Sequence, residues 1–310
     1  MSTPSRLATA WIAAAAILVS GCAQLETSKS PTAPSATASP SASDFTEPGS
    51  ATAMVKQLMA KANSTAALMV EITESTVQVS VLDDAHQPTT WAYRGGEIAQ
   101  VPSDLAYVDQ STFSISRFNI NDVGALFRAA AGMAGSEQDQ SLTIVDYSGG
   151  EVVMSVSTVP ESRTVFFNPD GSLLPVLDFD TPGGIAQGLK EAIGTRSTVA
   201  SITVESDQGA WVDFPADTET TTRRTRTQKV PVTTNVRAEK LELPMFNAAS
   251  VDAAAIWRVV DGLRGTSEIP EQSKWSVVID DRDALGVPRM HFTIGPKVVV
   301  TDLAGNVVST

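Results

Sequence analysis

The sequence repeats itself at a spacing of about 130 residues, a length sufficient for a whole domain. Leu126-Phe127-Arg128 recurs as Ile256-Trp257-Arg258, and the matches keep their order along the chain. The other matching pairs are Phe113-x-Ile115-x-x-Phe118-Asn119 with Leu241-x-Leu243-x-x-Phe246-Asn247, Gly132-Met133 with Gly262-Leu263, Met154-x-Val156 with Met290-x-Phe292, Pro160 with Pro296, and Asp170-Gly171-Ser172-Leu173-Leu174 with Ala304-Gly305-Asn306-Val307-Val308. The repeat predicts two homologous domains, at residues 50–180 and 181–310.

Within each copy, the spacing of apolar residues changes between helical and strand periodicity. Val77-Gln78-Val79-Ser80-Val81 alternates as a strand does, whereas Leu126 and Phe127 fall on one face of a helix. Helices are expected at residues 54–62, 121–134, 182–193 and 251–263, and strands at 77–81, 91–93, 113–115, 142–147, 152–157, 164–167, 201–205, 209–214, 229–233, 275–279, 289–294 and 298–301. Expected caps are Ser50 or Thr52, Asn121 and Thr181 at helix N-termini and Gly135 at a C-terminus, with Met133 on a buried face.

Each copy is therefore predicted to consist of two successive α-β-β-β units. Strands that alternate between apolar and polar side chains are typical of a sheet that buries one face only. The predicted fold class is α+β, with an antiparallel sheet in each domain and helices packed on one face of it.

The amino-terminal end has the pattern of a secretory signal. Arg6 supplies positive charge, and residues 7–19 form an apolar run of about 13 residues, shorter than the roughly 20 that a membrane-spanning helix needs. Val19-Ser20-Gly21-Cys22 follows directly. This ending resembles the lipobox of bacterial lipoproteins, in which the cysteine receives a diacylglyceryl group and becomes the mature amino terminus.

The lipobox resemblance implies a signal peptide at residues 1–21, cleavage between Gly21 and Cys22, and a lipid on Cys22. Two acyl chains on one cysteine are sufficient for stable anchoring, so the protein is expected at the cell membrane, on its extracytoplasmic face. Cys22 is the single cysteine of the sequence, which excludes an intrachain disulfide. Two alternatives stay open: an uncleaved membrane helix, and an ordinary secretory signal that is cut elsewhere.

Residues 22–49 are rich in Ser, Thr, Pro and Ala and contain few large apolar side chains. Such a segment cannot bury enough apolar surface to offset the entropy lost on ordering, so it is expected to be a disordered tether. The net charge of −13 disfavours nucleic acid as a partner, because the phosphate backbone repels an acidic protein.

The end of the second copy, Val299-Val300-Thr301-Asp302-Leu303-Ala304-Gly305-Asn306-Val307-Val308, together with the helix and strands before it, resembles extracytoplasmic domains of the PepSY type. The tandem α+β repeat is similar in outline to secreted β-lactamase inhibitory proteins, and the whole chain resembles lipoproteins of high-GC Gram-positive bacteria. These resemblances rest on the order of elements and one turn motif per copy. They imply a fold and a location, and they carry over no functional residues.

Groups that could perform catalysis are scarce. The two histidines are His86, in an expected turn, and His291, on an expected strand whose neighbouring residues point to the opposite face. The sequence contains no nucleophile elbow, zinc-binding helix motif or phosphate-binding glycine loop. Residues 280–283 (Asp-Asp-Arg-Asp) are consistent with a cation-binding loop or a solvated hairpin turn, and the spacing of an EF-hand is absent. No catalytic residue, metal site or cofactor is predicted.

A basic segment stands out in this acidic chain: Arg223, Arg224, Arg226 and Lys229 lie close together in sequence. One interpretation is contact with an anionic partner, and the other is an edge strand protected by charge. Four tryptophans raise the question of an aromatic platform, namely Trp91, Trp211, Trp257 and Trp275. The last two are expected in the core.

The predicted function is that of a non-enzymatic binding or regulatory module for a protein partner in the cell envelope, presented by the lipid anchor. A sheet with one polar face leaves a broad surface free for association. The alternative is a carrier of a lipid or another apolar envelope ligand in a cavity between sheet and helices. An enzyme is the least supported class, because few suitable groups are present.

Overall fold

The computed structural model describes residues 44–103, 110–158 and 163–308. The predicted signal peptide, the lipobox with Gly21 and Cys22, and nearly all of the predicted tether lie outside these residues, as does Pro160. In the part that is described, no helix has both the length and the apolar character needed to cross a membrane. We call residues 44–180 the first half of the protein and residues 181–308 the second half.

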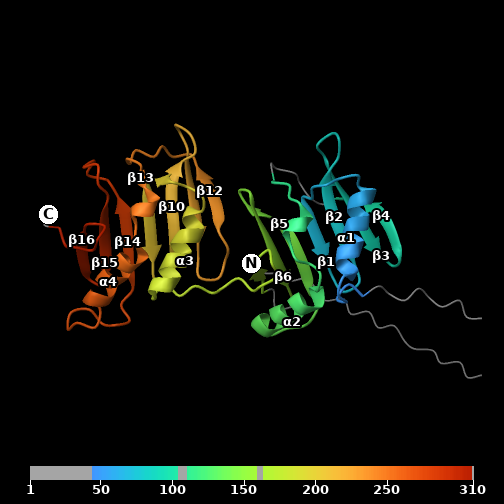
Figure 1. Cartoon of the computed structure of the whole chain (residues 1–310), viewed down its shortest axis with the longest axis horizontal. Helices are drawn as coiled ribbons and strands as arrows, with labels where there is room; N and C mark the ends of the chain where they lie inside the picture. The colour runs from blue at the N-terminus through green and yellow to red at the C-terminus, as the bar shows by residue number, and fades with distance from the viewer. Residues whose placement is uncertain (1–43, 104–109, 159–162, 309–310) are drawn as a thin grey trace, which may run out of the picture. The chain divides into compact units, whose positions relative to one another are not determined.

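The first half contains a seven-stranded antiparallel sheet and two α-helices (Figure 1). Its elements are α1 (Ser50–Lys61), β1 (Met69–Ile72), β2 (Val77–Leu82), β3 (Pro88–Arg94), β4 (Glu97–Val101), the short 3-10 helix η1 (Ile115–Arg117), α2 (Val123–Ala134), β5 (Ser141–Ser148), β6 (Glu151–Ser157) and β7 (Val165–Phe167). The strand order β4-β3-β2-β1-β5-β6-β7 places a four-stranded meander beside a three-stranded one.

The second half contains another seven-stranded antiparallel sheet, in the order β12-β11-β10-β9-β14-β15-β16. Its elements are α3 (Pro182–Ile193), β8 (Thr198–Val199), β9 (Ser201–Glu205), β10 (Gly209–Pro215), β11 (Thr221–Arg226), β12 (Thr233–Arg237), β13 (Phe246–Asn247), η2 (Ala248–Ser250), α4 (Ala253–Leu263), β14 (Trp275–Asp280), β15 (Arg289–Ile294) and β16 (Lys297–Thr301). The short strands β8 and β13 pair with each other. The two seven-stranded sheets thus have the same connectivity.

These elements confirm the predicted α+β class and the antiparallel sheets. The predicted α-β-β-β unit is wrong for the first part of each half, where four strands of the seven-stranded sheet follow the helix. Sequence periodicity misses β1 and β4 in the first half and β8, β11 and β13 in the second. The strand expected at residues 229–233 is misplaced, because residues 229–232 lie outside any strand and only Thr233 belongs to β12. The strand β11 reads Thr-Thr-Arg-Arg-Thr-Arg, so it offers no apolar alternation from which a strand could be recognised.

The strand expected at residues 113–115 is also wrong. Phe113 forms a single antiparallel bridge with Ala67, and η1 begins two residues later. Phe246 pairs with Val199 just before η2, so Phe113 and Phe246 occupy corresponding places. The repeat in the sequence pairs Phe246 with Phe118 instead, and this pairing is wrong, because short apolar motifs can be aligned in more than one register.

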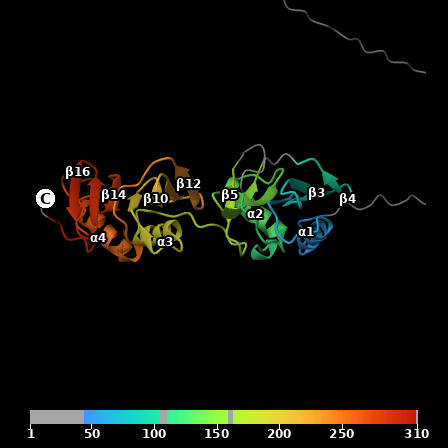
Figure 2. The same cartoon turned by 90° about the horizontal axis from the view of Figure 1, so that it is seen from above.

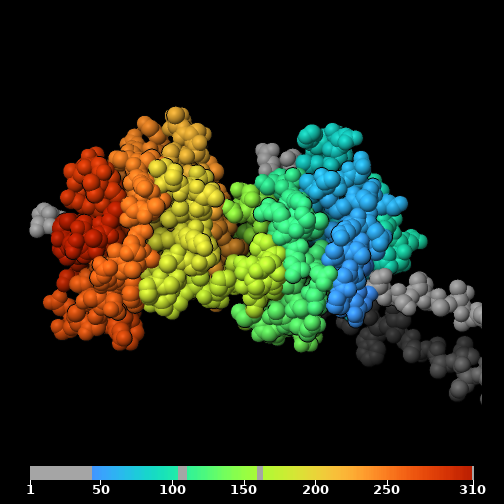
Figure 3. All heavy atoms as spheres, in the orientation of Figure 1, coloured from blue at the N-terminus to red at the C-terminus, as the bar shows by residue number. Residues whose placement is uncertain are grey.

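Each half buries one face of its sheet beneath its helices. In β2, Val77, Val79 and Val81 are buried and belong to the core that also contains Leu58 of α1. Within each half the helices lie on one side of the sheet (Figure 2), and the atoms of α1, drawn in blue, cover part of the first sheet (Figure 3). Phe45 is buried in the same core, so the folded part begins within the predicted tether of residues 22–49.

Helix ends follow local chemistry. The side chains of Asp122 and Thr181 accept hydrogen bonds from backbone N–H groups in the first turns of α2 and α3, and Gly135 ends α2 with a φ of 76°. Thr181 and Gly135 were predicted. The N-cap of α2 is Asp122 and not the predicted Asn121. The helix α1 begins after Gly49 without a side-chain cap, so the prediction of Ser50 or Thr52 as its N-cap is wrong. Met133 is 53% exposed rather than buried.

The turns that close the two halves have the same backbone hydrogen bonds. The Gly171 N–H donates to the Asn168 carbonyl at 2.9 Å, and the Gly305 N–H donates to the Asp302 carbonyl at 3.1 Å. Both glycines have a positive φ, 91° and 87°, which explains why glycine stands at this position in both copies. The repeated motif seen in the sequence therefore marks a repeated turn.

Candidate binding surfaces and cavity

The sheet of the second half has a face that points away from α3 and α4, which we call the open face. Strand pairing places side chains across it in one row, because Arg223 is opposite Asp213, Asp213 opposite Ser201, Ser201 opposite Asp280, and Asp280 opposite Arg289. The row crosses five strands, β11, β10, β9, β14 and β15. The row therefore carries two carboxylates in its inner part and an arginine at each end.

Asp213 holds two arginine side chains on the open face. Arg223 donates from Nε and Nη2 to the two carboxylate oxygens at 2.8 and 2.7 Å, and Arg237 donates from Nη2 at 3.3 Å. Asp213 has a side chain only 8% exposed, so this bidentate pair lies partly out of water. The hydrogen bond to Asp213 raises the pKa of Arg223 above its ordinary value. The Arg223 guanidinium also lies 5.4 Å from the centre of the Trp211 ring.

Asp280 makes a similar pair two strands away. Arg282 donates from Nε and Nη2 to its carboxylate, both at 2.7 Å. His291 Nε2 lies 3.8 Å from the Asp280 Oδ1 and is buried, with no hydrogen-bond partner among the residues described. Burial, followed by the positive charge of Arg282, lowers the pKa of His291. Met290 and Phe292 point into the core, so His291 lies on the open face as predicted.

The predicted basic segment does not form one surface. Arg223 points to the open face, whereas Arg224 and Arg226 point toward α3. Arg224 donates to the carbonyls of residues 191 and 192 at the end of α3 and forms an ion pair with Glu151. The Arg226 side chain is 0% exposed, pairs with Glu191 and donates to the carbonyls of residues 175, 227 and 230. Lys229 lies in the turn after β11.

Contact between this segment and an anionic partner therefore stays a prediction. Two of its three arginines are engaged with α3, and only Arg223 has a guanidinium on the open face. The other interpretation, an edge strand protected by charge, is wrong, because β11 is an inner strand of the sheet and β12 is the edge.

Residues 280–283 use their carboxylates within their own turn. Asp281 accepts hydrogen bonds from the backbone N–H groups of Leu285 and Gly286 at 2.8 and 2.9 Å, and Asp280 pairs with Arg282. These contacts favour the hairpin interpretation over the cation-binding loop. In the three described ranges, no group of three or more His, Cys, Asp or Glu side chains is arranged to hold a metal ion.

The tryptophans divide between core and surface. Trp275 is buried in the second core, and Trp257 and Trp91 are partly buried against the cores of their halves. Trp211 lies on the open face beside Arg223. The described residues thus contain one tryptophan on this face, which does not amount to a platform of several rings.

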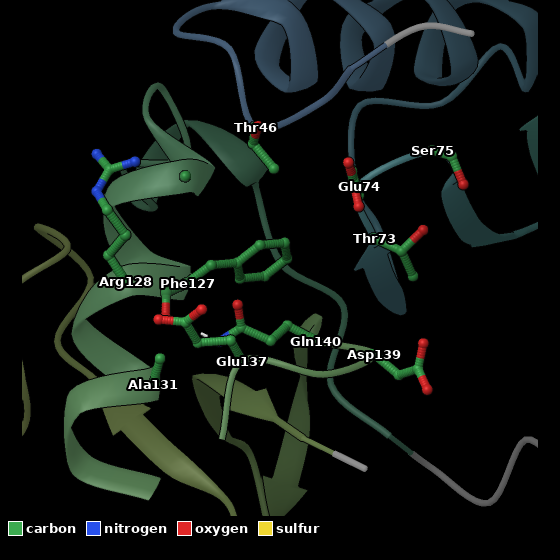
Figure 4. A pocket seen from close by; sticks show the side chains of 11 residues that line it. Thr46, Thr73, Glu74, Ser75, Phe127, Arg128, Ala131, Glu137, Asp139 and Gln140 are labelled. Carbon is green, nitrogen blue, oxygen red and sulfur yellow. Dashed lines mark hydrogen bonds between the residues drawn. The ribbon is translucent and has the colours of Figure 1, made fainter. Parts of the chain in front are cut away.

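A cavity of about 660 Å³ lies in the first half, beside α2 (Figure 4). It is formed by α2, the β1–β2 turn, the connection from α2 to β5 and the segment before α1, through Thr46, Thr73, Glu74, Ser75, Gly124, Phe127, Arg128, Ala131, Glu137, Asp139 and Gln140. The ring of Phe127 projects from α2 toward Gln140 (Figure 4), whose side-chain amide donates to the Phe127 carbonyl at 2.8 Å. No pattern in the sequence predicts this cavity.

The segment before α1 contacts α2 closely at one edge of the cavity. The Gly124 N–H donates to the Thr46 carbonyl at 3.3 Å, and a Cβ at Gly124 would come within 2.6 Å of the same oxygen. Only a residue without a side chain fits there, since real Cβ contacts below 3.0 Å are essentially not found. The cavity wall therefore depends on glycine at this position.

No protein family model and no curated protein matches this sequence. Among solved structures, the chain has a faint likeness to one described as the crystal structure of a GH62 hydrolase in complex with xylotriose. The alignment has 11% sequence identity, covers 78% of this chain and 68% of the other, and has a TM-score of 0.14. A score this low reflects no common fold and gives no indication of function.

Proposed function

We propose that this chain is a lipid-anchored cell-envelope lipoprotein that acts as a non-enzymatic binding or regulatory module for a protein partner. The lipobox ending Val19-Ser20-Gly21-Cys22 supports the anchor, and the Ser/Thr/Pro/Ala-rich tether would hold the folded part away from the bilayer on the extracytoplasmic side. The two halves, which share one connectivity and one closing turn, are proposed to be homologous domains that arose by duplication.

The observation that carries the binding role is the open face of the second half. Its guanidinium groups are fixed before any partner arrives, because buried carboxylates of Asp213 and Asp280 hold Arg223 and Arg282 in bidentate pairs. Arginine and tryptophan are, with tyrosine, the residues enriched at the energetic centres of protein interfaces. Side chains that are already ordered lose little entropy on binding, which favours a stable complex.

The lipid-carrier alternative receives less support. A carrier of acyl chains needs an apolar cavity between sheet and helices, and in both halves large apolar side chains fill that space. The cavity in the first half is lined by carboxylates and hydroxyls as well as by Phe127, which does not suit an acyl chain. The scarcity of histidines and the lack of a nucleophile elbow, a zinc-binding helix motif or a phosphate-binding glycine loop in the sequence favour the non-enzymatic proposal.

Site-specific photocrosslinking in intact cells tests the proposal. A photoreactive amino acid is placed at Thr225, which is opposite Trp211 on the open face, and, as the control, at Lys190 on the exposed side of α3. The proposal expects a discrete adduct with one protein from position 225 and not from position 190. Equal labelling at both positions, or a copurifying lipid in native mass spectrometry without any protein adduct, would contradict it.

A further inference from the structure

The cavity of the first half lies at a place that the second half fills. In the first half, Leu142 pairs with Ile72, and in the second half Val277 pairs with Val204 at the corresponding point of the sheet. The residue two positions earlier is Gln140 in the first half and a tryptophan, Trp275, in the second. Trp275 lies on β14 and shares the core face with Val277, because side chains two apart on a strand share a face. Gln140 comes just before β5, and its side chain points toward α2, where its amide donates to the Phe127 carbonyl.

Trp275 and its neighbours close this position in the second half. Trp275 is 2% exposed, and its Nε1 donates to the Asp180 carboxylate at 2.7 Å. Arg264 pairs with the same carboxylate at 2.9 Å, and Ile269 is buried here in a connection, residues 264–274, that is longer than residues 135–140 of the first half. In the first half the connection between helix and strand is shorter, and Gln140 is smaller than Trp275, so the corresponding space is not filled and forms the cavity.

Charge at the rim is also reversed between the halves. Directly before Trp275 lies Lys274, which forms an ion pair with Asp207 in the β9–β10 turn. Directly before Gln140 lies Asp139, and the corresponding β1–β2 turn carries Glu74. The first half thus has a second carboxylate where the second half has the lysine. In the described part of the chain, neither Asp139 nor Glu74 takes part in an ion pair.

The cavity as a whole is short of positive charge. Its carboxylates are Glu74, Glu137 and Asp139, and its single guanidinium, on Arg128, is 75% exposed. A cation that entered would meet carboxylates at the rim, and its alkyl stem would lie near the Phe127 ring. Carboxylates bind ammonium and guanidinium groups through charge-assisted hydrogen bonds, and an aromatic ring adds attraction for a cation.

We propose that this cavity binds a basic side chain, a lysine or arginine presented by a peptide segment of another protein, which takes the place that Lys274 occupies in the second half. A volume of about 660 Å³ lies within the range of ligand-binding pockets, roughly 300–1,000 Å³. This site lies in the other half of the protein from the open face, and none of its residues belongs to that face. It therefore goes beyond the proposed function and does not depend on it.

The test measures binding of a fluorescein-labelled peptide, Gly-Lys-Gly-Lys-Gly, to the full chain in an uncharged detergent by fluorescence polarisation. Asp139→Lys restores the charge pattern of the second half, because the new ammonium group can pair with Glu74 within the protein. It is expected to weaken binding by about tenfold or more, the ratio for about 1.4 kcal/mol. The peptide with both lysines acetylated is expected not to bind.

A matched control separates the site from general attraction to an acidic protein. Asp84→Lys makes the same change of charge in the β2–β3 turn, where the residue is exposed, and it is expected to alter the affinity less than threefold. Gln140→Trp, which introduces the residue of the second half without changing charge, is also expected to weaken binding by filling the cavity. Equal effects of Asp139→Lys and Asp84→Lys, or unchanged binding in Asp139→Lys, would overturn the proposal.

Discussion

Removing the charge of Glu191 should destabilise the second half strongly, because it leaves the Arg226 guanidinium buried without a counter-ion. Arg226 is fully buried on β11 beneath α3, and Glu191 is its one carboxylate partner in the described structure. Breaking a buried ion pair by removing one partner typically costs about 3–5 kcal/mol. The expected cost of Glu191→Gln is at the lower end, about 3 kcal/mol. Three backbone carbonyls still accept hydrogen bonds from the guanidinium, and the Glu191 side chain keeps some contact with water.

Urea unfolding followed by circular dichroism measures this cost. With a slope of about 2 kcal/mol/M, a loss of about 3 kcal/mol lowers the midpoint by about 1.5 M. Glu242→Gln is the matched control, because Glu242 pairs with Lys240 at 3.7 Å on the surface, where a pair contributes less than about 1 kcal/mol. If both variants lowered the urea midpoint equally, the buried structural role of Arg226 would be contradicted, and Arg226 would again be a candidate for contact with an anionic partner.

Two further outcomes follow from the same structure. Burial lowers the pKa of His291, so the folded state binds its proton less readily than the unfolded state does. The free energy of unfolding should therefore fall as the pH drops below about 6.5, the ordinary pKa of histidine. Urea midpoints measured at pH 5.5 and 7.5 should show this fall, and His291→Gln should reduce it. Gly188→Ala should lower the free energy of unfolding by about 1–3 kcal/mol, because the new Cβ would lie 2.4 Å from the buried Phe179 ring. Gly183→Ala is the control: it has open space around it and should leave the melting temperature unchanged or raise it.

Much of the architecture could be predicted from the sequence because it is repeated and periodic. The four helices, the strands with alternating apolar residues such as β2, and the closing turns with Gly171 and Gly305 all carry local signals. The strand β11 could not be recognised, because its side chains are threonines and arginines, and Arg224 and Arg226 are held by residues of α3 more than 30 positions away in sequence. Tertiary contacts, and not local propensity, determine whether such a segment forms a strand.

The candidate sites were harder to predict for the same reason. Arg223, Arg224 and Arg226 look alike in sequence, yet strand alternation sends the first to the open face and the other two beneath α3. The cavity depends on the absence of a large side chain at Gln140, which becomes visible only when Trp275 is known to hold the same place in the other half. A correct alignment of the two copies across the longer connection of residues 264–274 would have provided that signal.

Intact-protein mass spectrometry of the chain extracted from membranes of its own cells tests most directly whether this protein works outside the cell from a lipid anchor. The account predicts a mature chain that begins at Cys22 and carries a diacylglyceryl group on its sulfur, and a Cys22→Ala variant that keeps residues 1–21 or is released to the medium. A mature chain with an unmodified Cys22 thiol, or a Cys22→Ala variant of unchanged mass and membrane fraction, would contradict it.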